Sequence, residues 1–160
     1  MKKATLFLPL ILIICLAGCA VKEDVALECI ADEIPSLPAY YMVMDLPENV
    51  FLTQSSEEGR ISLFTHRDYE ILQEIFYAED QAAAIRHISG QNLDPICTGD
   101  DGLRLAWVSA QDSGLITCSA VLLCDGDYYY SLCIRCAAEL EKEYHQDFSR
   151  ILSGVSLEPV

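Results

Sequence analysis

Basic side chains are scarce in this 160-residue chain. Ten lysines and arginines stand against 25 aspartates and glutamates, which gives a formal charge of −15 at neutral pH. Proteins bind nucleic acid mainly through clustered lysine and arginine side chains on phosphates. This chain is therefore not expected to bind nucleic acid. Its length suits one domain with a substantial hydrophobic core.

Motifs for catalysis and for cofactor binding are also missing. No His-Glu-x-x-His, Gly-x-Ser-x-Gly, Gly-x-Gly-x-x-Gly or phosphate-binding Gly-Lys-Ser/Thr occurs. Only three histidines are present, at positions 66, 87 and 145. Asp94, Asp100 and Asp101 could supply oxygen ligands to calcium, but their spacing matches no EF-hand and also suits a solvated turn. We expect no catalytic residue, metal or cofactor, although a hydrolase built from distant residues stays open.

The one long hydrophobic run lies at the N-terminus. It extends from Ala4 to Ala17 behind a short basic segment and contains Pro9, as in a signal peptide rather than a membrane span. The run ends in Leu16-Ala17-Gly18-Cys19, which resembles the bacterial lipobox. The resemblance implies that Cys19 is lipidated and becomes the first residue of a protein anchored on the extracytoplasmic face of the cell membrane. An ordinary secretory signal, cleaved near Ala17 or Ala20, is the alternative.

Three segments follow from this interpretation. Residues 1–18 are a lipoprotein signal peptide, and residues 19–38 are an acidic, proline-containing tether. Residues 39–160 form a single domain. Part of 25–30 could alternatively add a first strand.

The domain alternates strand and helix patterns. Short runs rich in β-branched and aromatic residues predict strands over 40–44, 50–53, 61–66, 69–77 and 103–108, and an apolar stripe predicts a helix over 137–152. Asp80 can cap a short helix over 81–89, and Gly90 stands where a left-handed residue ends helices. These elements predict an α+β fold. It consists of an antiparallel sheet with a meander, one short helix and a C-terminal helix packed on it.

The strongest local signal is a hairpin about Asp125-Gly126, the dipeptide that favours a two-residue type I′ turn. Pairing about that turn places Val121 opposite Tyr130 and Cys118 opposite Cys133. A disulfide between Cys118 and Cys133 is therefore the best candidate bridge.

Eight cysteines are present, of which six remain after Cys15 and Cys19 are set aside. An even number of cysteines in an exported chain suggests disulfides, and buried reduced thiols are the alternative. Cys133 and Cys136 have the spacing of a redox pair, but strand alternation would point their side chains to opposite faces. A small surface thiol-redox protein thus remains a second hypothesis for function.

Three consecutive tyrosines follow the turn. Alternation sends Tyr128 and Tyr130 to one face of the sheet and Tyr129 to the other. An exposed Tyr129 could anchor a binding partner. A second face covered by a helix is the alternative.

The order of these elements is similar to that of the PsbP-like fold. The resemblance rests on a strand pair, a short helix, a meander with the hairpin at 125–130, and a terminal helix followed by 153–157. It implies a non-enzymatic binding or assembly role and assigns no functional residue. The sequence therefore predicts a lipid-anchored module that binds another protein or a small ligand.

Overall fold

The computed structural model describes residues 37–56, 58–99, 102–112 and 114–160. The elements in this part of the chain are β1 (Tyr40–Val43), β2 (Phe51–Ser55), β3 (Ile61–Thr65), β4 (Tyr69–Tyr77), α2 (Gln81–Ser89), β5 (Cys97–Gly99), β6 (Gly102–Gln111), β7 (Gly114–Cys124), β8 (Tyr128–Ala137), α3 (Glu141–Ser153) and β9 (Ser156–Pro159). Among the described helices, none has the length and apolar character needed to span a membrane. The predicted signal peptide, the tether to residue 36 and the possible strand at 25–30 lie outside the described residues.

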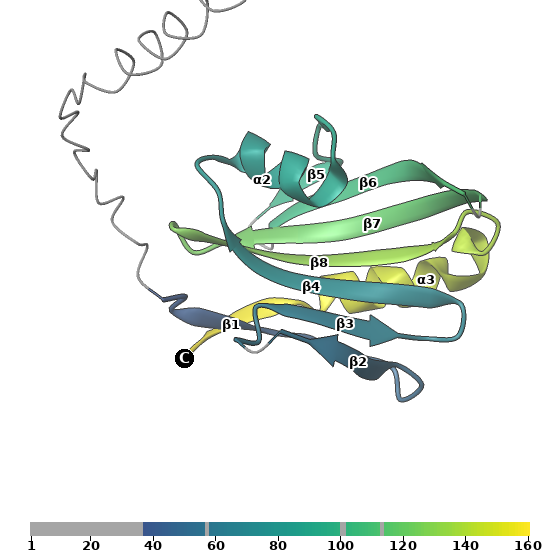
Figure 1. Ribbon diagram of the computed structural model, residues 1–160, viewed down its shortest axis with the longest axis horizontal. Helices are drawn as coiled ribbons and strands as arrows, with labels where there is room; N and C mark the ends of the chain where they lie inside the picture. Colours follow the sequence, from purple (N-terminus) through teal and green to yellow (C-terminus); the bar gives the residue numbers. More distant parts are fainter. Residues whose placement is uncertain (1–36, 57, 100–101, 113) are drawn as a thin grey trace, which may run out of the picture. The chain divides into compact units, whose positions relative to one another are not determined.

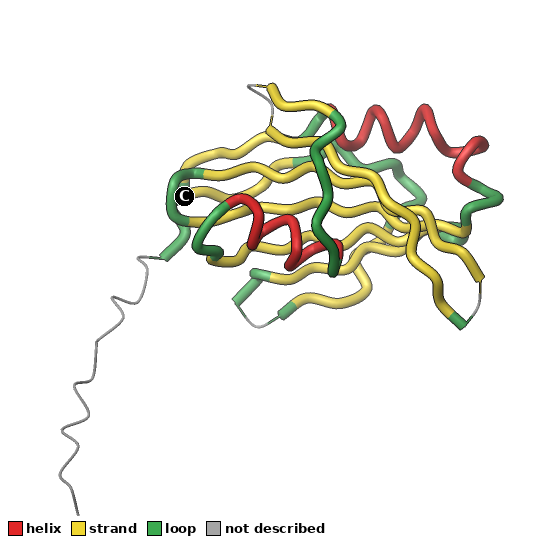
Figure 2. Tube along the Cα trace, turned by 90° about the horizontal axis from the view of Figure 1, so that it is seen from above, coloured by secondary structure: helices red, strands yellow, loops and turns green. Residues whose placement is uncertain are grey.

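The predicted α+β fold is confirmed. Seven strands form one antiparallel sheet in the order β2-β3-β4-β8-β7-β6-β5, and β1 pairs with β9 in a separate two-stranded sheet. The helices α2 and α3 lie on opposite sides of the large sheet (Figures 1 and 2). Each side of the sheet therefore has a hydrophobic core of its own.

Alternation along β8 fills both cores. Tyr130, Leu132 and Ile134 are fully buried on the side that α3 covers, which we call the α3 face. Cys133 and the partly buried Tyr129 belong to the opposite side, the α2 face. A strand that is buried on both faces needs apolar side chains at nearly every position. This explains why the sequence of β8 is almost continuously apolar.

The short helix α2 forms as predicted. The Asp80 side chain accepts a hydrogen bond of 2.6 Å from the backbone N–H of Ala83. Gly90 has a φ of 71° and closes the other end. Strand β4 also has the predicted bounds, as its β-branched and aromatic content indicated.

The predicted hairpin register is wrong by two residues. Arg135, not Cys133, lies opposite Cys118, and the backbone N–H of Asp125 donates to Tyr128. Gly126 and residue 127 are therefore the central pair of the turn. The Asp125 carboxylate explains the shift, because it accepts hydrogen bonds from the N–H groups of residues 127 and 128 and so fixes Asp125 before the turn. Gly126 then has a φ of 111° at the first central position, where type II′ turns favour glycine.

Two short strands were missed. β5 lies in the segment expected to be a loop, and β9 follows α3 and pairs with β1. The C-terminal helix also begins at Glu141 rather than at Ala137, because β8 continues through Ala137 and pairs with β7 there. The predicted stripe on α3 is correct at Phe148, Ile151 and Leu152, which are buried.

Candidate functional site

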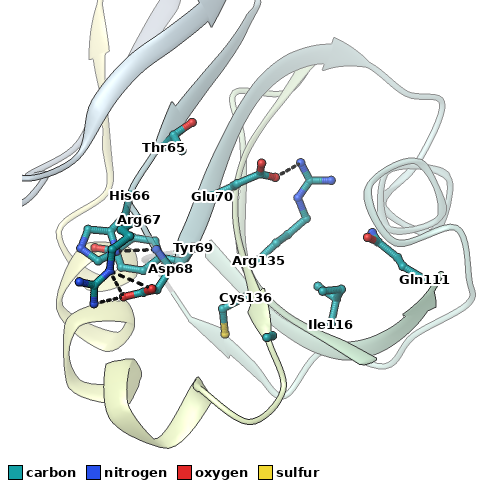
Figure 3. A pocket seen from close by; sticks show the side chains of 11 residues that line it. Thr65, His66, Arg67, Asp68, Tyr69, Glu70, Gln111, Ile116, Arg135 and Cys136 are labelled. Carbon is teal, nitrogen blue, oxygen red and sulfur yellow. Dashed lines mark hydrogen bonds and ion pairs between the residues drawn. The ribbon is translucent and has the colours of Figure 1, made fainter. Parts of the chain in front are cut away.

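Two adjoining cavities flank the turn between β3 and β4. The first, of about 340 Å³, lies on the α2 face at the end of the sheet that holds this turn (Figure 3). The second, of about 660 Å³, shares the side chains of Thr65, His66 and Arg67 with the first. We call the two cavities together the turn site.

A pair of opposite charges lines the first cavity. Glu70 on β4 is directly opposite Arg135 on β8, and their side chains point toward one another at 3.2 Å (Figure 3). Both side chains are partly exposed, so the pair is expected to stabilise the fold by no more than about 1 kcal/mol. The Arg135 Nε is buried and has no hydrogen-bond partner among the described residues. The exposed parts of this pair can contact a polar ligand, and separating the two charges would cost the fold little.

The turn itself is tied to α3 by a carboxylate. Asp68 accepts a hydrogen bond of 2.9 Å from Arg67 and one of 2.5 Å from the Tyr144 hydroxyl on α3. The hydrogen bond from Arg67, followed by that from Tyr144, lowers the pKa of Asp68 to about 2. Asp68 is therefore ionised at any ordinary pH, which keeps both contacts intact.

Aromatic rings also pack against the β3–β4 turn. His66 stacks on Tyr69 with ring centroids 4.3 Å apart, and Tyr69 meets Tyr144 and Phe148 edge-on at 5.2 and 5.1 Å. His66 Nδ1 accepts the backbone N–H of Asp68, and the Asn49 amide lies 2.9 Å from Nε2. These contacts brace the turn on which the turn site is built.

The second cavity has a different chemical character. Asn49, Phe51, Thr53 and Tyr144 line it together with the three shared residues, and no carboxylate lines it. The first cavity, by contrast, includes Asp68 and Glu70. The second cavity is therefore a hollow without carboxylates on a strongly acidic chain.

The turn site has side chains suited to non-covalent contacts with a ligand. Cys136 borders the first cavity, but its side chain is buried in the core on the α3 face, and this burial raises the pKa of its thiol, which makes it a weak nucleophile near neutral pH. Within the described residues, no cluster of three His, Cys, Asp or Glu side chains could hold a metal ion. The lining also includes two guanidinium groups, carboxylates, hydroxyls and aromatic rings, which can hold a ligand by hydrogen bonds, ion pairs and stacking.

Cys118 and Cys133 are not directly opposite one another as predicted. With Ala120 opposite Cys133, Cys118 and Cys133 are diagonal neighbours on the α2 face, and both are buried free thiols. A hydrogen bond from Cys133 lowers the pKa of Cys118. The disulfide between them stays a prediction. Cys136 is buried on the α3 face, so the sheet separates it from Cys133 as alternation predicted.

Tyr129 lies on the face predicted for it, but its ring is partly buried. The ring stacks with Phe76 at 6.1 Å between centroids and packs against the core under α2. The alternative stated for Tyr129, a second face of the sheet covered by a helix, is therefore what the structure has at this position. A partner-binding role for Tyr129 has not been tested, and Cys19 lies outside the described residues.

The sequence analysis missed the residues of the turn site. Glu70 and Arg135 are 65 positions apart, and Asp68 and Tyr144 are 76 apart, so no local motif joins them. His66 was noted only as the end of a strand. The polar residues at 65–70, between two strand patterns, were the one available signal.

Comparisons with known proteins place the fold. No protein-family model and no curated protein matches the chain. Among solved structures, it is similar to LpqN, "involved in cell envelope biogenesis of Mycobacterium tuberculosis", with 11% identity and a TM-score of 0.50. That match covers 79% of this chain and 88% of LpqN. A second similar structure is cyanobacterial PsbP (CyanoP) from Synechocystis sp. PCC 6803, with 8% identity, a TM-score of 0.41, and 78% and 95% of the two chains covered. At this identity the LpqN match establishes the fold alone: this chain has an α+β fold that also occurs in a protein of cell envelope biogenesis.

Proposed function

We propose that this protein is a lipid-anchored module on the extracytoplasmic face of the cell membrane, which binds a ligand or a protein partner and catalyses no reaction. The turn site is the observation that carries the binding part of the proposal. It combines the accessible Glu70–Arg135 pair, the braced Arg67 and cavities of about 340 and 660 Å³. Ligand sites in proteins have this combination of a concave surface and a few fixed polar groups.

The anchoring part rests on the N-terminal sequence. A basic start, an apolar run and Leu16-Ala17-Gly18-Cys19 together resemble the signal of a bacterial lipoprotein. Acyl chains on Cys19, a palmitate among them, would anchor the protein more firmly than a single myristoyl group does. The surface location also agrees with the fold shared with LpqN, a protein of cell envelope biogenesis. The narrower PsbP-like assignment belongs to this proposal as well, with the assembly role that it implies.

A ligand screen with matched substitutions tests the binding site. The full chain is mixed with muropeptide fragments, phospholipid headgroups and short sugars, and its Tm is measured. A ligand at 100 times its Kd stabilises the folded state by about 2.7 kcal/mol and raises the Tm. Arg135→Gln and Thr65→Val should remove the shift, whereas Arg86→Gln, on the exposed side of α2, should keep it. A shift that survives both turn-site substitutions, or turnover of a compound, contradicts the proposal.

A thiol-redox protein is the second candidate. The contact between Cys118 and Cys133 is the observation that favours it. Both thiols are buried, however, and a redox enzyme needs a thiol that its substrate can reach. Rapid reaction of either cysteine with a thiol reagent in the native protein would favour this candidate over the binding module.

A further inference from the structure

The second cavity of the turn site includes a largely exposed aromatic ring. Phe51 on the outer strand β2 lines this cavity and is 65% exposed. A ligand that lies on the face of such a ring removes apolar surface from water. Leu52, the next residue, is also exposed but is not among the residues that line the cavity. The cavity therefore offers an apolar contact surface at one defined place.

Two threonine hydroxyls of the same cavity form a directed chain of hydrogen bonds. Thr53 Oγ1 donates to the backbone carbonyl of Leu63 over 3.1 Å and lies 2.9 Å from Thr65 Oγ1. A hydroxyl has only one proton, so Thr65 is the donor in the contact between the two side chains. Within the described residues Thr65 Oγ1 accepts no hydrogen bond in return. Thr65 thus presents a hydrogen-bond acceptor to the cavity.

The tautomer of His66 determines how the Asn49 amide is oriented. His66 Nδ1 accepts the backbone N–H of Asp68, so the proton of the neutral ring is on Nε2. The Asn49 amide lies 2.9 Å from Nε2, and only its oxygen can accept from an N–H group. The amide NH2 group is then left to donate to a ligand. Asn49 is therefore a donor that complements the Thr65 acceptor.

The charge at the second cavity is balanced. Arg67 donates to the Asp68 carboxylate through its Nε and Nη2 groups, so this guanidinium is not an isolated cation. Its side chain is 84% exposed, and its other N–H groups can reach a ligand. The whole chain has a formal charge of −15, which repels anions that approach its surface. An uncharged polar ligand therefore suits this cavity better than an anion does.

We infer that the second cavity binds a neutral saccharide, with one sugar ring on the Phe51 ring and sugar hydroxyls bonded to Asn49 and Thr65. A sugar ring has an apolar C–H face and a rim of hydroxyls, each of which can donate and accept hydrogen bonds. These features match the aromatic ring, the amide donor and the hydroxyl acceptor of the cavity. Its volume of about 660 Å³ lies within the range of small-molecule sites. The inference rests on the proposed function, because it names the ligand class of the turn site.

Titration calorimetry with the full chain tests the ligand class. The neutral probes are cellobiose and N,N′-diacetylchitobiose, and at least one of them should bind. Phe51→Ala should raise the Kd of that probe about tenfold, because the ring contact is lost. Leu52→Ala is the matched control, since it truncates the exposed neighbour that does not line the cavity, and it should leave the Kd unchanged.

Polar substitutions and a charged sugar extend the test. Asn49→Ala should also weaken binding, whereas Gln54→Ala, at another exposed position that does not line the cavity, should not. Glucuronate differs from glucose by one carboxylate and should bind more weakly than glucose. The Tm of each variant without ligand should equal that of the wild type, because all four substituted side chains are exposed.

Three results would overturn the inference. They are no binding of either neutral probe at concentrations up to about 10 mM, an equal Kd for Phe51→Ala and Leu52→Ala, and tighter binding of glucuronate than of glucose. The proposed function is decided separately, by whether any ligand in the Tm screen gives a shift that depends on Arg135 and Thr65. A phospholipid headgroup that gives such a shift while the saccharides do not bind would overturn this inference alone.

Discussion

Asp68 is the residue whose ionisation joins the β3–β4 turn to α3. Its carboxylate is held by Arg67 and by the Tyr144 hydroxyl, which lowers its pKa from 3.8 to about 2. A carboxyl with a depressed pKa in the folded state stabilises the protein above its unfolded pKa. That stabilisation is lost as the pH falls through the folded value. The bracing of the turn site should therefore weaken only in strong acid.

Asp68→Asn tests this bracing. At neutral pH the variant should unfold at lower denaturant concentration than the wild type, because the charge-assisted contacts are lost. The difference in unfolding free energy should shrink as the pH falls from about 4 to about 2, where the wild type also loses the charge. Asp112→Asn, at an exposed position, is the control. A difference that stays constant across this pH range contradicts the assigned role of Asp68.

The cysteines give a second prediction at this scale. Cys118 and Cys133 are diagonal neighbours on one face, whereas Cys136 is on the other side of the sheet. Mild oxidation should therefore link Cys118 to Cys133 before it links Cys133 to Cys136. Peptide mapping by mass spectrometry, after free thiols are alkylated under denaturing conditions, identifies the linked pair. A link between Cys133 and Cys136 would show that β8 does not continue through Ala137.

Among the elements, α3 closes the core on one face of the sheet. Phe148 is buried there and meets the Tyr69 ring at 5.1 Å. Phe148→Ala should lower the unfolding free energy by about 3–5 kcal/mol, the usual cost of removing a buried phenylalanine side chain. Chemical denaturation measures this change, with Ser149→Ala on the exposed side of α3 as the control. An unchanged stability would mean that the stripe on α3 is not part of the core.

Elements with strong local signals could be predicted, and elements decided by tertiary pairing could not. Asp80 and Gly90 mark the two ends of α2. A capping side chain and a left-handed glycine both depend only on residues within one helical turn, so they can be recognised from the sequence. The β7–β8 register depended on where the Asp125 side chain binds the backbone, which the Asp-Gly dipeptide alone does not determine. β9 has four residues and no alternating pattern, so only its pairing with β1 defines it.

The turn site could not be predicted for the same reason. Its charges meet only after β4 pairs with β8 and α3 lies against the β3–β4 turn. Each of these residues looks like an ordinary surface residue when the sequence is examined alone. The side to which Tyr129 points was predictable from alternation, but its partial burial required knowing that α2 covers that face.

The whole molecule is an acidic domain that follows a segment resembling a lipoprotein signal. Its formal charge of −15 disfavours contact with an anionic membrane surface, so a firm attachment would depend on the acyl chains that we propose for Cys19. Lipidation is thus the feature on which the proposed location depends.

Mass spectrometry of the mature protein from the membrane fraction tests this claim most directly. The account predicts that the wild-type protein begins at Cys19 and carries acyl chains on that residue. Cys19→Ser should yield no mature lipoprotein in the membrane fraction, whereas Cys29→Ser should be processed like the wild type. An unmodified wild-type Cys19, or cleavage at another residue, would contradict the account.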